Sequence, residues 1–355
     1  MPDTLAPDPE ATLSRKIVRK TSLGLKWQSI ISRMAASPAQ PANLEVVDLR
    51  AFRADDVRPL LDEQSRFWKS SYRWDFDASR DVILRFIDTR NLYGFSLLSE
   101  GRLVGYSYFV HEHRKALIGD LFITKSHRTE QAERYLLYNT LQAATAVPGV
   151  ARLEGQLLAL SFNPSGEVLR GRQLQVHERS FMMMDDFRKL QAGSPGGSAF
   201  RYLPWSENDL DATAELICHS YESHVDSLIN DQYRSLTGAR RFLYNSTQHP
   251  GCGLFFRRGA LSAIEPSARM LCGICLGSLV EPRVGHITQL CVAPFARGKG
   301  IGYELLRRAG KSFQEYGCDA VSLTVTSSNK GAVQLYERLG FSVLRRFFAF
   351  VWETQ

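Results

Sequence analysis

A short stretch of this chain combines a strand-like run, a proline, glycines and cations at spacings suited to binding an anion. The run Ile287–Val292 is short and partly β-branched, as in a buried strand, and Pro294 ends further sheet pairing. The residues that follow, at the start of a helical pattern, are Arg297, Gly298, Lys299, Gly300 and Gly302. Glycines leave backbone N–H groups uncovered, and a helix N-terminus favours negative charge. The stretch therefore predicts a cradle for a diphosphate.

The spacing of the glycines excludes two common phosphate-binding loops. The stretch lacks the Lys-Ser/Thr ending of a P-loop, so hydrolysis of a nucleoside triphosphate is not expected. Its glycines follow Gly-x-Gly-x-Gly and not Gly-x-Gly-x-x-Gly, so the dinucleotide-binding pattern fails as well.

The loop resembles the Arg-Gly-x-Gly-x-Gly/Ala loop of the GNAT superfamily of acyl-CoA-dependent N-acetyltransferases. In that family the loop follows a strand reading Leu-x-Val-x-Pro, and Leu290, Val292 and Pro294 fill those places here. A second family element, residues 329–341, follows with the pattern Asn-x-x-Ala-x-x-x-Tyr-x-x-x-Gly-Phe. The resemblance implies acetyl-CoA as the acyl donor. The implied cofactor-binding residues are Leu290, Cys291, Val292, Arg297, Gly298, Lys299, Gly300, Ile301, Gly302 and Asn329.

The resemblance also implies roles in catalysis for a few groups. The backbone N–H of Val292 would face the thioester oxygen, where its strand splays from the next one at a bulge. Tyr336 lies where GNAT enzymes place a tyrosine that protonates the leaving thiolate, and phenol and thiol pKa values are close. His286 lies where family members carry a catalytic glutamate or histidine, so it is the candidate base. A histidine capping the start of the strand, or proton transfer to water alone, are the alternatives for His286.

Composition indicates a globular protein large enough for two domains. The chain has 355 residues, of which 44% are hydrophobic and 23% charged. Its net charge of +7 is modest, and a ligand carrying several phosphates accounts for part of it, so nucleic-acid binding is not expected. No apolar run reaches about 18 residues and no signal-peptide core follows the start, so we expect no transmembrane segment and a cytoplasmic location.

The six cysteines do not indicate a metal site. Cys272 and Cys275 have the spacing of a redox or zinc motif, but they lie in an apolar run that reads as a strand. No second Cys or His pair complements them, so we expect buried strand cysteines and no metal.

The first half of the chain repeats the pattern of the loop without a gap. Leu121, Ile123 and Arg128 align with Leu290, Val292 and Arg297 at an offset of 169 residues (292 − 123). This resembles a tandem GNAT arrangement, which implies an α/β fold of two GNAT-like domains, each a central mixed β-sheet flanked by helices. The first copy lacks the loop glycines and has Thr129, Glu130, Gln131 and Glu133 in the corresponding places, while Arg170 stands where the tyrosine is expected. We therefore expect a degenerate, non-catalytic first copy.

The predicted domain organisation has four parts. Residues 44–190 form the degenerate copy, 191–198 a Gly- and Ser-rich linker, and 199–355 the catalytic domain. Residues 1–43 are a basic extension, partly disordered or helical, for which docking on the protein, membrane contact or an acidic partner are all open.

The sequence says less about which residues would bind the amine that accepts the acetyl group. Between Tyr202 and Tyr233 there are seven acidic residues and no Lys or Arg. This pattern either attracts a cationic amine or marks helix faces that are exposed to solvent. Tyr221, His224 and Asp226 are candidates for acceptor contact. The expected function is acetyl transfer from acetyl-CoA to a primary amine, small or peptide-borne, by direct attack in a ternary complex. The alternative is a non-enzymatic acyl-CoA-binding regulatory or scaffolding protein. The oligomeric state is left open.

Overall fold

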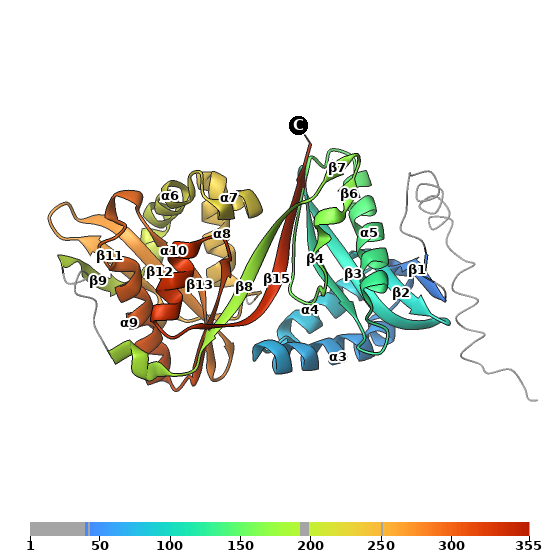
Figure 1. Ribbon diagram of the computed structural model, residues 1–355, viewed down its shortest axis with the longest axis horizontal. Helices are drawn as coiled ribbons and strands as arrows, with labels where there is room; N and C mark the ends of the chain where they lie inside the picture. Colours follow the sequence, from blue (N-terminus) through green and yellow to red (C-terminus); the bar gives the residue numbers. More distant parts are fainter. Residues whose placement is uncertain (1–39, 42, 192–198, 250, 355) are drawn as a thin grey trace, which may run out of the picture. The chain divides into compact units, whose positions relative to one another are not determined.

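The structure is a computed structural model that describes residues 40–41, 43–191, 199–249 and 251–354 (Figure 1). Nearly all of the basic extension predicted for residues 1–43, and residues 192–198 of the predicted linker, lie outside the described residues. None of the described helices is both long and apolar enough to cross a membrane.

The chain forms two compact units, and neither is one continuous stretch. Unit 1 contains the residues up to Gln64 together with Arg80–Gln175 and Phe350–Gln355. Unit 2 contains Ser65–Ser79 and Val176–Ala349. These boundaries differ from the linear ones expected from the sequence, 44–190 and 199–355, because two helices and two strands each contribute residues to both units.

Unit 1 is an α/β arrangement around a mixed sheet with the strand order β1-β2-β3-β4-β5. The neighbouring strands are antiparallel except β4 and β5, which are parallel. Its elements are β1 (Leu44–Asp48), the start of α3 (Ala54–Tyr72), most of α4 (Asp77–Asp88), β2 (Tyr93–Ser99), β3 (Arg102–Glu112), β4 (Lys115–Ile123), α5 (Glu130–Ala146), β5 (Arg152–Leu157), β6 (Val168–Leu169) and β7 (Arg172–Gln173).

Unit 2 repeats this arrangement, with the strand order β8-β14-β13-β12-β11-β9. Here β13 and β14 are the parallel pair, and the pairs on either side are antiparallel. Its elements are β8 (Gln175–Met184), β9 (Arg201–Pro204), α6 (Leu210–Tyr221), α7 (Val225–Ile229), α8 (Leu236–Gln248), β10 (Leu254–Phe255), β11 (Leu261–Glu265), β12 (Met270–Glu281), β13 (Val284–Val292), α9 (Ile301–Tyr316), β14 (Ala320–Thr326), α10 (Lys330–Arg338) and β15 (Ser342–Glu353).

Helix α9 packs on β12 and β13 where strand glycines leave room for its apolar side chains. A Cβ at Gly285 would lie 2.5 Å from the Phe313 ring, and a Cβ at Gly273 would lie 3.1 Å from Ile301 and Leu305. The helix ends at Gly317, whose φ of 104° favours glycine and allows the N–H of Cys318 to bond the carbonyl of Phe313. This close packing fixes the direction in which the N-terminus of α9 points.

Segments distant in sequence from the rest of each unit complete it. In unit 2, β8 pairs with β14 from Arg179–Thr326 to Met184–Val321, which covers an edge that β14 would otherwise expose. In unit 1, the N–H of Thr354 bonds the carbonyl of Ala151 at 2.8 Å, and the indole N–H of Trp352 bonds the carbonyl of Leu169 at 2.9 Å. Residues distant in sequence are therefore integral to each unit.

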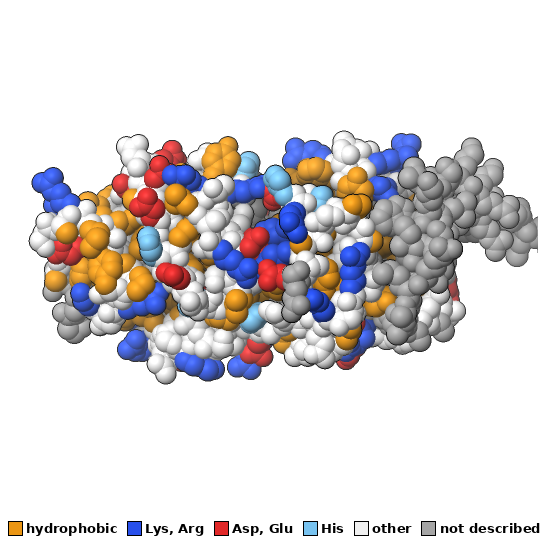
Figure 2. Space-filling model, turned by 90° about the horizontal axis from the view of Figure 1, so that it is seen from above, with side chains coloured by type: hydrophobic (Ala, Val, Ile, Leu, Met, Phe, Trp, Pro, Cys, Tyr) orange, Lys and Arg blue, Asp and Glu red, His pale blue; other side chains and the backbone are white. Residues whose placement is uncertain are grey.

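Charged side chains on the face drawn in Figure 2 are interspersed. Blue and red groups alternate there with hydrophobic and neutral ones, and the excess of basic residues is not gathered into one surface on that face.

Candidate active site

The glycine-rich loop leads into α9 with its backbone N–H groups exposed. Gly298 and Gly300 both have φ of 77°, a left-handed conformation in which an L side chain is strained. Gly300 is the N-cap of α9, and no side chain caps the helix. The first N–H groups of α9 therefore have no partner within the helix, which is the arrangement that binds a phosphate.

The cations of the loop have different surroundings. The guanidinium of Arg297 donates from Nη2 to the carbonyl of Ser220 at 2.7 Å and from Nε to the carbonyl of Val292 at 3.3 Å. Arg297 thus braces the loop against the end of α6 and of β13. Lys299 is exposed and remains near the helix N-terminus. Of the remaining predicted cofactor-binding residues, Cys291 and Ile301 are buried, while Leu290, Gly302 and Asn329 are half-buried.

Strands β13 and β14 separate beside the loop. Their parallel pairing runs from Val284–Ala320 to Ile287–Leu323 and then stops, although β13 continues to Val292. At that point Thr288 is an extra residue in the pairing of β13 with β12, which makes it a β-bulge. The predicted bulge and divergence of the two strands are confirmed.

The divergence leaves particular N–H groups of β13 facing the gap. The N–H of Ala293 bonds the carbonyl of Cys272 on the β12 side at 2.8 Å. Because N–H groups alternate in direction along a strand, those of Leu290 and Val292 point away from β12. They face the space that opens between β13 and β14, next to the glycine loop.

Tyr336 on α10 is buried in the core of unit 2, with 9% of its surface exposed. Burial, and to a smaller extent the negative charge of Asp226, raise the pKa of Tyr336, so its phenol stays protonated at neutral pH. A protonated phenol is what a general acid requires.

His286 does not have the surroundings of a general base. Its side chain is 6% exposed, and its ring lies 5.0 Å from that of Trp74 and 6.1 Å from that of Phe181. Nδ1 lies 2.9 Å from the hydroxyl of Ser322, which itself donates to the carbonyl of Gly285. Burial lowers the pKa of His286 to about 3, so the ring binds a proton poorly at neutral pH. Trp74 and Phe181 lie far from His286 in sequence, so local sequence gives no sign of this burial.

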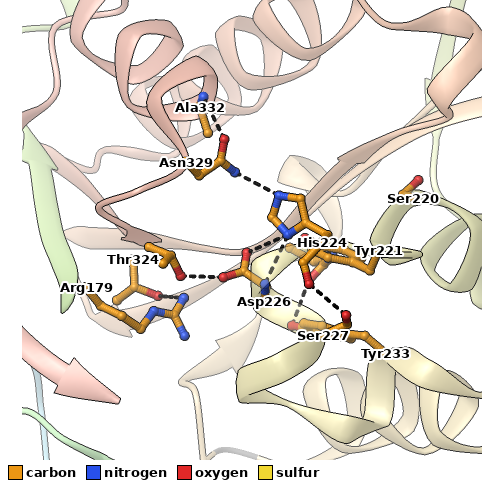
Figure 3. Close-up of polar contacts among 12 residues, drawn as sticks. Arg179, Ser220, Tyr221, His224, Asp226, Ser227, Tyr233, Thr324, Asn329 and Ala332 are labelled. Carbon is orange, nitrogen blue, oxygen red and sulfur yellow. Dashed lines mark hydrogen bonds and ion pairs between the residues drawn. The ribbon is translucent and has the colours of Figure 1, made fainter. Parts of the chain in front are cut away.

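A cluster of polar side chains surrounds Asp226, one of the residues that the sequence suggested for contact with the acceptor (Figure 3). Thr326 on β14 donates its hydroxyl to Oδ1 of Asp226. His224 lies beside Asp226, with Nδ1 3.6 Å from Oδ2, and its Nε2 lies 3.1 Å from Nδ2 of Asn329. Arg179 on β8 approaches the hydroxyl of Thr324 at 3.5 Å. Of the three acceptor candidates named from the sequence, His224 and Asp226 come together with Asn329 here.

The third candidate, Tyr221, is held by a residue that the sequence analysis did not select. Nε2 of Gln289 donates to the hydroxyl of Tyr221 at 2.9 Å. Oε1 of Gln289 accepts a hydrogen bond from the hydroxyl of Tyr233 at 3.3 Å. The two tyrosine rings stack with centroids 4.4 Å apart. Burial is the main cause that raises the pKa of Tyr221. A glutamine in the middle of the apolar run Ile287–Val292 was the available signal.

Most of the acidic residues between Tyr202 and Tyr233 do not line this cluster. Glu207, Asp211, Glu215 and Glu222 are exposed, and the first two form ion pairs with surface arginines. Among these acidic residues, Asp226 is the one whose negative charge contributes to the raised pKa values of Tyr221, Tyr233 and Tyr336.

The corresponding place in unit 1 is closed by its own side chains. Thr129 caps α5 by accepting the N–H of Ala132 at 3.2 Å. Glu133, at the place of Gly302, is buried and accepts from Nε of Arg128 at 2.9 Å and from the N–H of Ser161 at 3.0 Å. The helix N-terminus that has no side-chain cap in unit 2 is thus capped by Thr129 in unit 1, with Glu133 in its first turn.

Cys272 and Cys275 are buried in β12, as expected from the sequence. All six cysteines are free, and Cys272, Cys275, Cys291 and Cys318 are buried. Within the described ranges, no group of three or more His, Cys, Asp or Glu side chains is placed to hold a metal ion.

Comparison with known proteins identifies relatives of part of the chain. Residues 226–341 match the acetyltransferase (GNAT) family. Over 133 residues the chain is 40% identical to N-alpha-acetyltransferase MAK3 of Arabidopsis thaliana, which is 36% of this chain and 61% of that protein. Over 94 residues it is 46% identical to mycothiol acetyltransferase of Salinispora arenicola, which is 25% of this chain and 30% of that protein. The chain therefore spans less than two thirds of the length of these relatives.

Solved structures resemble a much larger share of the chain. A GCN5-related N-acetyltransferase from Sphaerobacter thermophilus has a TM-score of 0.60 at 16% identity, covering 89% of this chain and 97% of that one. A tandem GNAT protein from the clavulanic acid biosynthesis pathway has a TM-score of 0.53 at 16% identity, covering 87% and 98%. The protein has the α/β GNAT fold with a mixed sheet and helices, as predicted. The matches together support the GNAT acetyltransferase family.

Proposed function

We propose that unit 2 transfers an acetyl group from acetyl-CoA to a primary amine by direct attack in a ternary complex. The observation that carries this proposal is the divergence of β13 from β14 after Ile287–Leu323, beside an uncapped helix N-terminus. The N–H groups of the loop and of α9 bind the diphosphate of CoA, with Lys299 adding positive charge. The N–H of Val292 stabilises the negative charge that develops on the thioester oxygen.

In this proposal, Tyr336 protonates the thiolate that leaves. Its phenol is protonated at neutral pH, so it has a proton to give to the thiolate. Asp226 replaces His286 as the group that receives the proton of the amine, directly or through a water molecule. It is half-buried, and one of its carboxylate oxygens is held by Thr326.

The acceptor in this proposal is a primary amine on a small molecule or a peptide. Some relatives are named N-alpha-acetyltransferase and others mycothiol acetyltransferase, so their names do not choose between the two kinds of acceptor. We also propose that the chain is a tandem of two GNAT-like copies and that unit 1 is non-catalytic, because its helix N-terminus is capped by Thr129 and has the acidic Glu133 in its first turn.

Replacing Tyr336 by Phe tests the enzymatic role against that of a non-enzymatic acyl-CoA-binding regulator. Loss of a general acid should lower kcat by about 100-fold or more, with the Kd for acetyl-CoA changed less than about threefold. Tyr244→Phe is the matched control, because Tyr244 is 55% exposed on α8, and it should leave both quantities unchanged. A wild-type protein that binds acetyl-CoA and acetylates no amine in a broad panel would favour the regulator.

A further inference from the structure

The side chain of His224 connects the acceptor segment to the helix that carries Tyr336. Nε2 of His224 lies 3.1 Å from Nδ2 of Asn329 (Figure 3). Asn329 is the N-cap of α10, and its Oδ1 accepts the N–H of Ala332 at 3.2 Å. That bond fixes which end of the amide faces the imidazole, so the NH₂ group of Asn329 points at Nε2. Nε2 must therefore be an acceptor.

The other ring nitrogen decides where the proton of a neutral imidazole lies. Nδ1 of His224 faces the backbone N–H of Asp226 at 3.1 Å, so both ring nitrogens face a donor. A neutral imidazole accepts at one nitrogen and donates at the other. Oδ2 of Asp226, 3.6 Å from Nδ1, is the nearest carboxylate oxygen to that nitrogen. The contact with Asn329 requires the tautomer with the proton on Nδ1 and a lone pair on Nε2, in which Nδ1 no longer accepts the N–H of Asp226 that caps α7.

A second contact ties the same segment to the same connection. Thr326 at the end of β14 donates to Oδ1 of Asp226, and the N–H of Asn329 bonds the carbonyl of Thr326 at 2.9 Å. The residues from His224 to Asp226 are thus held at two points to the turn between β14 and α10. Seven residues after Asn329, on α10, comes Tyr336.

We propose that His224 is a positioning residue for acyl transfer, which acts by holding Asn329 and α10 so that Tyr336 and Asp226 lie on either side of the reacting groups. This inference rests on the proposed function of unit 2. His224 is not a base in this scheme, because its free lone pair is already bonded to Asn329. Protonation of Nε2 would place two donors face to face and break the contact.

The charged and titratable groups around His224 come from several elements. Asp226 lies on α7 and Tyr221 on α6, where its ring contacts that of His224 edge-on at 5.2 Å. His177 and Arg179 on β8 act on the same cluster, since the charge of Asp226 bears on His177 and that of Arg179 on Tyr336. Asp226 is therefore the one carboxylate among these groups, and its Oδ2 lies 3.6 Å from Nδ1 of His224.

Two substitutions separate the two nitrogens of the ring. His224→Gln places an amide oxygen near the position of Nε2, so it keeps an acceptor for Asn329 and cannot titrate. His224→Asn places an amide near Nδ1 and cannot reach Asn329, although asparagine is a good N-cap for α7. We expect Gln to keep kcat within about threefold and Asn to lower kcat by about tenfold or more, with unchanged Kd for acetyl-CoA in both.

Rescue by glutamine supplies a readout that a merely structural role would not change, because glutamine restores the acceptor for Asn329 and asparagine does not. Equal losses of kcat for His224→Gln and His224→Asn would overturn the proposal.

A measurement without turnover separates this inference from the proposed function. The ¹⁵N shifts of the His224 ring, assigned by their loss in His224→Asn, should show an unprotonated Nε2 at neutral pH. A ring protonated at Nε2 would refute the contact even in an active enzyme. If Nε2 is unprotonated but no amine is acetylated, the contact stands and the enzymatic proposal fails.

Discussion

Gly119 in unit 1 and Thr288 in unit 2 are each the extra residue of a β-bulge, and they lie 169 residues apart, the offset at which the two halves of the sequence align. In unit 1 the parallel pairing of β4 with β5 stops at Ile118–Gly155, one residue before the bulge. In unit 2 it stops at Ile287–Leu323, again one residue before the bulge. A bulge redirects a strand, so both units contain the divergence on which the proposed chemistry of unit 2 depends. What differs is the helix start that follows.

We expect one acetyl-CoA to bind per chain. The N-terminus of α5 in unit 1 is capped by Thr129, and the buried carboxylate of Glu133 would repel a diphosphate. Isothermal titration calorimetry of the full chain should give a stoichiometry near one, and Glu133→Gln should leave it unchanged. Two equivalent sites would refute the assignment of unit 1 as non-binding.

Replacing Gly298 by Ala should weaken acetyl-CoA binding by reshaping the loop. A Cβ there meets nothing within 4 Å, so strain at φ of 77° is the cause, and it costs about 1–2 kcal/mol. We expect about tenfold weaker binding, measured by calorimetry.

Gly331→Ala is the control for that substitution. Gly331 lies in the first turn of α10, also with nothing within 4 Å of its Cβ, but without a positive φ. Alanine there should keep the Kd for acetyl-CoA and raise the Tm slightly, because it limits the unfolded chain. Equal effects of the two substitutions would argue against strain at Gly298.

His286 should make stability depend on pH. Its pKa is about 3 in the folded protein, against about 6.5 when unfolded. Between these values the unfolded chain binds a proton that the folded protein does not, so stability falls as the pH drops from about 6.5 toward 3. His286→Leu should flatten this slope in urea unfolding experiments. It should also keep kcat within about tenfold, whereas a far larger loss would restore His286 as a candidate base.

The fragment 199–355, the domain expected from the sequence, should not fold alone. It lacks β8, whose removal exposes the β14 edge from Val321 to Thr326, and it lacks Trp74 and Phe181, which cover His286. We expect aggregation or an absence of a cooperative transition by circular dichroism. A monomeric fragment that binds acetyl-CoA like the full chain would contradict this expectation.

The sequence was sufficient for features that depend on local spacing. Glycines at 298 and 300 predicted a loop with exposed N–H groups, and both have the positive φ that glycine tolerates. The ungapped repeat predicted two similar halves, and the strand orders and bulges of the two units agree with it. The family element that begins at Asn329 coincides with a structural boundary, because Asn329 is the N-cap of α10.

The tertiary structure decided which polar groups lie together and which are buried. The sequence offered His286 as the candidate base and His224 as a candidate for acceptor contact, but Trp74 and Phe181 bury the first, while Asn329 and Asp226 surround the second. Burial and hydrogen bonding depend on residues brought together from distant parts of the chain, and these set the protonation of a side chain. The limits of the two units likewise follow from the pairing of β8 with β14, which no local pattern specifies.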